Sequence, residues 1–113
     1  MIPHAIKTFP GIFGTIAVAA EPETNNPVIY GLFDKNDNPV DSLRFQDGAP
    51  PANGFCIEDI LNIAKDRIQH LDSELPSDFN KVAVEHIEAA LGALKERLNQ
   101  RINEARHYVI FYV

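Results

Sequence analysis

The chain has 113 residues, a formal net charge of −6 and 45% hydrophobic residues. This length suits one domain with a modest core, and the acidic balance argues against nonspecific binding to DNA or RNA. No apolar run approaches the roughly 18 residues of a membrane span, and glycine and proline interrupt the apolar N-terminal residues. We therefore expect neither a membrane segment nor a signal peptide. The single cysteine, Cys56, leaves no internal disulfide and favours a cytoplasmic protein.

The first part of the chain, residues 1–55, predicts strands and turns because it holds most of the glycines and prolines. Residues 11–20 and 28–33 are apolar and partly β-branched, as is typical of strands. A turn rich in Asp and Asn follows at residues 34–39, and then a weakly alternating run. We therefore expect residues 28–45 to form a β-hairpin.

The next part, residues 56–106, predicts two helices. Apolar residues recur every three or four positions over residues 57–71, which indicates an amphipathic helix. Ser77 or Asp78 can cap the second helix, which we expect over residues 79–106 with a near-heptad apolar seam. That helix would be about 40 Å long, so the first helix covers only part of its seam. A second chain is the simplest partner for the remainder.

The last residues, 107–113, are strongly β-prone. We expect them to join the sheet, since an unpaired run of this kind would promote aggregation. The predicted fold is a single α+β domain with a β-rich part at residues 1–55, a two-helix antiparallel hairpin at 56–106 and a C-terminal strand at 107–113. Its small antiparallel sheet would combine the N-terminal strands with that C-terminal strand.

Arg97 and Arg101 lie at positions i and i+4 of the second predicted helix and so share one face. Two guanidinium groups at this spacing form a fork-shaped receptor for a phosphate or diphosphate. The alternative is a solvated helix flank in which these arginines pair with Glu96, Gln100 or Glu104. From the sequence alone, that flank is the more common arrangement.

Asn80, at the start of the same helix, can read the edge of a base through its amide or simply cap the helix. Position 97 lies 17 residues after position 80, which is roughly 25 Å along a continuous helix. Asn80 and Arg97 can therefore touch one small ligand only if the site lies between subunits. Two long helices that run antiparallel across a two-fold axis would satisfy this condition.

The sequence offers no support for catalysis or for a metal site. The four histidines lack metal-ligand spacing, and neither a serine elbow nor a glycine-rich phosphate loop occurs. We therefore expect no enzyme activity, no metal and no cofactor. His70 near the end of the first helix can stack on a base, and so can Phe79 beside Asn80. A helix-end histidine near the negative dipole end and an aromatic packing anchor are the more ordinary interpretations of these two residues.

A series of short motifs spans about half the chain, and their order and spacing are more informative than any single motif. The motifs are Phe45-Gln46-x-Gly48-x-Pro50, Asn53-Gly54, Glu58-Asp59-Ile60-Leu61, Asp66-Arg67-Ile68, Asn80, Ala90-Leu91, and finally Arg97 and Arg101. This series resembles a helical-hairpin domain of bacteriophage proteins, found in the anti-Thoeris and anti-CBASS sponges that sequester nucleotide immune signals. In the anti-Thoeris branch a β-rich part accompanies the hairpin, similar to residues 11–45 here, which favours that branch.

The resemblance implies a homo-oligomer, either a dimer or a hexamer built from dimers, that acts in the host cell cytoplasm and holds ligands between subunits. In anti-Thoeris proteins an asparagine at the start of the long helix reads adenine, and two later arginines bind the phosphates of a cyclic ADP-ribose isomer. Asn80, Arg97 and Arg101 match those positions. His70 aligns with a position that is usually aromatic, and we expect Phe79 and His70 to wall the pocket.

The chain departs from the family pattern beyond Arg101. The family usually continues with a third basic residue and a Gly-Val-Glu-Gly-Thr segment, whereas this chain has Glu-Ala-Arg-His-Tyr at residues 104–108. The expected function is sequestration of a cyclic nucleotide, most simply a cyclic ADP-ribose isomer, without its degradation. Two alternatives stay open: a sponge for CBASS cyclic di- or trinucleotides, and a noncatalytic oligomerisation or adaptor protein. In none of these do we expect a DNA, RNA or membrane partner.

Overall fold

The computed structural model describes the backbone of residues 4–112 and the side chains of residues 4–104. The chain divides into two compact units, Met1–Ile57 and Glu58–Val113. This division falls close to the predicted change from strands to helices. The assignment of both units to one domain stays a prediction.

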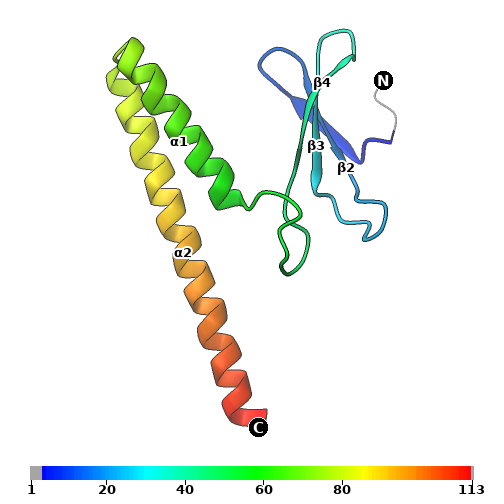
Figure 1. Ribbon diagram of the computed structural model, residues 1–113, viewed down its shortest axis with the longest axis vertical. Helices are drawn as coiled ribbons and strands as arrows, with labels where there is room; N and C mark the ends of the chain where they lie inside the picture. The colour runs from blue at the N-terminus through cyan, green and yellow to red at the C-terminus, as the bar shows by residue number, and fades with distance from the viewer. Residues whose placement is uncertain (1–3, 113) are drawn as a thin grey trace. The chain divides into compact units, whose positions relative to one another are not determined.

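The first unit is an antiparallel sheet in which the strands follow one another in chain order (Figure 1). Its strands are β1 (Lys7–Pro10), β2 (Thr15–Ala19), β3 (Ile29–Phe33) and β4 (Pro39–Arg44). The predicted hairpin is confirmed, because β3 pairs with β4 and places Tyr30 opposite Leu43. The sequence pattern missed β1, a short edge strand whose four residues are all exposed and which pairs with β2 alone.

The core of this unit is small and lies on β2. Val18 is 1% exposed and its neighbour Ala17 is also buried. Tyr30 of β3 lies opposite Val18 and meets the ring of Phe45 edge-on, with 5.3 Å between the ring centroids. Such edge-to-face contacts between aromatic rings are favourable beyond the area that they bury. The sheet is therefore held by a few central side chains and by its backbone ladder.

Gly14 fixes how the turn between β1 and β2 meets the sheet. A Cβ atom at this position would lie 1.9 Å from the backbone oxygen of Phe33. No side chain fits at that separation, so the close approach of the turn to the end of β3 requires glycine. Ile12 and Phe13, at the tip of the same turn, are exposed.

The second unit is a hairpin of two antiparallel helices, α1 (Ile57–Glu74) and α2 (Asp78–Tyr112) (Figure 1). Of the two cap candidates, Ser77 caps α2, because its Oγ accepts a hydrogen bond of 3.2 Å from the backbone N–H of Phe79. With 35 residues in α2 and 18 in α1, the helices are about 52 Å and 27 Å long. The α+β class and the helical hairpin are thus confirmed. No helix in the described part of the chain is long and apolar enough to cross a membrane.

The predicted C-terminal strand is wrong. Residues 107–112 continue α2 as helix, so the sheet contains only N-terminal strands. Propagation of an existing helix adds one hydrogen bond for each residue that is fixed and needs no new nucleus. A strand, in contrast, depends on neighbours to pair with, and β-propensity is correspondingly sensitive to context. In this chain the continuing helix prevails over the local preference of the β-prone run.

Candidate functional site

Residues 45–54 form a loop after β4 that is held by hydrogen bonds between its own side chains and its own backbone. The side-chain amide of Gln46 donates hydrogen bonds to the carbonyls of Gly48 and Pro51 at 3.3 and 3.2 Å, and its oxygen accepts one from the N–H of Asn53 at 2.8 Å. The amide of Asn53 in turn bonds both the N–H and the carbonyl of Asp47, at 2.9 and 2.8 Å. These two side chains satisfy the backbone of the loop and have a structural role.

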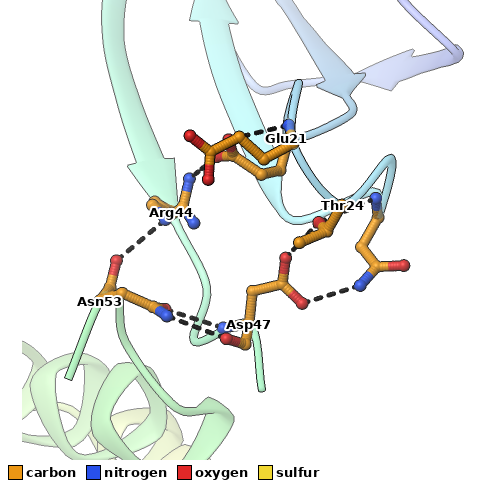
Figure 2. A network of polar contacts seen from close by, with 7 residues as sticks. Glu21, Thr24, Arg44, Asp47 and Asn53 are labelled. Carbon is orange, nitrogen blue, oxygen red and sulfur yellow. Dashed lines mark hydrogen bonds and ion pairs between the residues drawn. The ribbon is translucent and has the colours of Figure 1, made fainter. Parts of the chain in front are cut away.

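A polar network joins this loop to the loop between β2 and β3 (Figure 2). The carboxylate of Asp47 accepts hydrogen bonds from the hydroxyl of Thr24 and from the amide of Asn26, the latter at 2.8 Å. Both hydrogen bonds lower the pKa of Asp47, because they favour the charged carboxylate, and the bond from Thr24 has the larger effect. Asp47 is thus held as an anion that ties the two loops together.

Arg44, at the end of β4, extends the same network (Figure 2). Its guanidinium forms an ion pair with Glu21 and donates a hydrogen bond of 2.9 Å to the carbonyl of Asn53. The hydrogen bond from Arg44 is the main cause that lowers the pKa of Glu21. Arg44 is therefore occupied within the unit and is not available as an anion receptor.

At the turn between α1 and α2, one carboxylate organises the start of α2. Oδ1 of Asp72 accepts hydrogen bonds from the backbone N–H of Ser77 at 3.0 Å and from Nδ2 of Asn80 at 3.1 Å. Both hydrogen bonds lower the pKa of Asp72, and the bond from the N–H of Ser77 has the larger effect. Sequence analysis missed this residue. The only available signal was an acidic side chain five positions before a helix-capping serine.

Asn80 lies at a groove of about 370 Å³ between the two helices. Ile68 and Val84 contribute apolar surface to this groove. Its acidic side chains, Asp72, Glu85 and Glu88, outnumber the single cation among its described lining residues, Lys81. A planar apolar ring can lie against such a surface, whereas phosphate groups would be repelled by the carboxylates. The groove thus suits the base of a nucleotide better than its phosphates.

The two predicted wall residues do not line this groove. His70 on α1 lies with Nε2 3.2 Å from Oε1 of Glu74, one helical turn away, and both side chains are largely exposed. Phe79, in the first turn of α2, is 85% exposed. Their roles against a bound base stay predictions.

The two arginines project from the second half of α2. Arg97 and Arg101 are exposed, and neither forms an ion pair with any side chain that the structure describes. The nearby Glu104 accepts a hydrogen bond of 3.3 Å from Gln100. The pairing that would make these arginines an ordinary helix flank is therefore not formed within residues 4–104.

The candidate residues lie in two places on the hairpin. His70, Phe79 and Asn80 surround the turn, whereas Arg97 and Arg101 lie far along a continuous α2. The 17-residue separation between Asn80 and Arg97 corresponds to about 25 Å. One chain alone does not bring Asn80 and the two arginines together.

The apolar seam of α2 becomes more exposed beyond the length that α1 can cover. Side chains on the seam up to Leu94 are half-buried, whereas Leu98 and Ile102 are 53% and 42% exposed. Both exposed residues neighbour the arginines in sequence. The half of α2 that carries the arginines therefore also carries uncovered apolar surface.

No group of three or more His, Cys, Asp or Glu side chains in the described residues could hold a metal ion. In comparisons with known proteins, the chain matches no protein-family model and no curated protein.

Proposed function

We propose that this protein binds a cyclic nucleotide immune signal, a cyclic ADP-ribose isomer, and sequesters it intact. The observation that carries this proposal is the pair of exposed arginines on one face of α2. Arg97 and Arg101 form no ion pair with the described side chains, although acidic residues flank them in sequence. Two unpaired guanidinium groups one turn apart match the charge and geometry of a diphosphate.

The site would form between two copies of the chain. Asn80 and the groove beside it would take the base from one copy, and Arg97 and Arg101 of the other copy would take the phosphates. Three observations support this arrangement. Asn80 and Arg97 lie roughly 25 Å apart along one helix, the groove at the turn is acidic, and Leu98 and Ile102 are left uncovered. Antiparallel pairing of α2 across a two-fold axis would cover the seam and bring both halves of the site together.

The mechanism of such a protein is binding alone. Arg97 and Arg101 would clamp the diphosphate, Asn80 would read the base, and Phe79 and His70 would wall the pocket. Bound ligand is withdrawn from its receptor, so a tight complex present in excess lowers the free signal below the level that the receptor needs. No bond of the ligand has to break.

Subunit complementation tests the shared site. An Asn80→Ala chain and an Arg97→Ala/Arg101→Ala chain should each lose calorimetric binding of a cyclic ADP-ribose isomer while keeping their assembly. After the two variants are co-expressed with different tags and the mixed oligomer is purified, binding should return. One site of each mixed dimer then combines the intact asparagine of one chain with the intact arginines of the other.

A mixed oligomer that still binds nothing would contradict a site shared between copies. Loss of assembly in the arginine variant would instead show that Arg97 and Arg101 hold the oligomer together, and would leave the hairpin as an assembly device. Arg97→Lys/Arg101→Lys is the matched control for charge. It keeps two cations but not the planar fork, so we expect intact assembly and weakened binding.

A further inference from the structure

The side-chain amide of Asn80 has a defined orientation, because only one of its two ends can face Asp72. An ionised carboxylate accepts hydrogen bonds and donates none, so the group 3.1 Å from Asp72 Oδ1 must be the Asn80 NH₂. The pKa of Asp72 is lowered by the N–H of Ser77 and by this same amide, which keeps the carboxylate ionised at neutral pH. Asn80 therefore cannot turn its oxygen toward Asp72 without repulsion.

Asp72 is itself held in place from the other side. The backbone N–H of Ser77, which precedes α2, donates to the same Oδ1 at 3.0 Å. A backbone donor at the start of a helix cannot rotate away, so it anchors the carboxylate rigidly. The chain of contacts runs from the backbone of Ser77 through Asp72 to the amide of Asn80.

This arrangement leaves the other end of the Asn80 amide for a ligand. Within the described residues, no donor is bonded to Asn80 Oδ1 and no side-chain polar atom is buried without a partner, so this oxygen is open to solvent. The second hydrogen of Nδ2 is not used by the contact with Asp72. Asn80 thus presents an acceptor and a donor side by side at the groove that Ile68 and Val84 line.

We propose that Asp72 is a positioning residue that locks the Asn80 amide and thereby makes the base site selective for adenine over hypoxanthine; this inference rests on the proposed function. Adenine offers an amino donor beside a ring-nitrogen acceptor, which complements the amide as it is held. Hypoxanthine has a carbonyl in place of that amino group, and this oxygen would face Asn80 Oδ1. An asparagine without this contact could rotate its amide by about 180° and bind hypoxanthine equally well. The contact with Asp72 prevents this rotation in Asn80.

The test compares two ligands on the native protein. One is a cyclic ADP-ribose isomer whose riboses are joined through oxygen, which leaves the edges of adenine free, and the other is the same molecule with hypoxanthine. We expect the adenine form to bind tighter by roughly ten-fold or more, the discrimination typical of a bidentate asparagine contact. Equal affinities would overturn the inference and leave the proposed function standing, whereas binding of neither form would overturn both.

Variants at position 72 separate positioning from a merely structural role. Asp72→Ala frees the Asn80 amide, so we expect the ratio of the two affinities to fall to within about three-fold. Asp72→Asn should restore much of the ratio, because Ser77 N–H still holds the oxygen of the new amide in place to accept from Asn80. Asp78→Ala is the matched control, because this exposed carboxylate lies at the same turn but outside the groove lining, and it should keep the native ratio.

A purely structural role for Asp72 predicts a different result. Loss of the turn contact would then weaken both ligands by the same factor and leave the ratio unchanged, which would overturn the inference. A second readout needs no ligand. In the free protein the side-chain NH₂ of Asn80 should give an NMR signal with slowed hydrogen exchange, and that protection should be lost in Asp72→Ala and kept in Asp78→Ala.

Discussion

At the scale of single residues, carboxylates rather than apolar side chains fix the loops of the first unit. Asp47 accepts hydrogen bonds from Thr24 and Asn26, and these bonds hold its pKa below the ordinary value of an aspartate. The folded protein therefore binds fewer protons at this group than the unfolded chain does. Its contribution to stability is complete above about pH 4 and is lost as the pH falls through the lowered pKa.

Asp47→Asn tests this linkage. The variant should be less stable than the native protein at neutral pH, because an amide is a weaker acceptor for Thr24 and Asn26. The loss of stability on acidification below about pH 4 should also be shallower, and denaturant unfolding at several pH values measures both effects. Asp78→Asn is the control, since that side chain is fully exposed and its ion pair with Lys81 is long, at 3.9 Å. An unchanged pH dependence in Asp47→Asn would contradict the role assigned to the network.

Two glycines give opposite predictions for the same substitution. Gly14→Ala should destabilise the protein by about 2 kcal/mol or more, because its Cβ would overlap the backbone oxygen of Phe33. Gly92→Ala should stabilise it by roughly 0.5–1 kcal/mol, since a Cβ there meets nothing within 4 Å and alanine favours the helix. Denaturant unfolding of both variants checks the pair. Equal effects would show that the contact at Gly14 relaxes at little cost.

Individual residues were only partly predictable from the sequence. The cap at Ser77 could be inferred because a serine after a proline break is a strong local signal. Asp72 could not be identified, since its role depends on where a helix turn places it relative to Ser77 and Asn80. The sequence motif around Gln46 and Asn53 was recognised, but its structural role emerged only from the hydrogen bonds that close the loop.

At the scale of elements, helical periodicity and the turn-flanked hairpin were predictive, whereas the short edge strand β1 was not. The two helices and the hairpin of β3 and β4 follow from apolar spacing and turn residues over long windows. β1 has four exposed residues and no such pattern. The run at residues 107–112 has β-prone composition, but its covalent attachment to a helix decides its conformation.

The exposed seam of α2 yields a prediction about assembly. Leu98→Glu/Ile102→Glu places charge on the apolar surface that α1 leaves uncovered, so we expect the variant to remain a monomer of 12.6 kDa. Light scattering coupled to gel filtration measures the mass. Gln100→Glu, on the opposite face of the same helix, should keep the native mass. A native protein that is itself monomeric would contradict the pairing of α2.

At the scale of the whole molecule, a single copy of the chain has little buried core and does not bring together the residues of the proposed site. Among the sheet residues that the structure describes, only Val18 and Ala17 are buried, and no residue of α1 is fully buried. A chain of this length with so little buried apolar surface gains stability readily by association. The proposed function also needs association, because Asn80 and Arg97 are far apart on one helix, a separation that was already evident from the sequence.

The most direct test of the proposed function is a calorimetric titration of the native protein with a cyclic ADP-ribose isomer, followed by denaturation of the complex and identification of what is released. The account predicts tight binding, about one ligand for each site between copies, and recovery of the ligand unchanged. Absence of binding would contradict the proposed function. Recovery of a cleaved or rearranged ligand would contradict sequestration and would establish an enzyme instead.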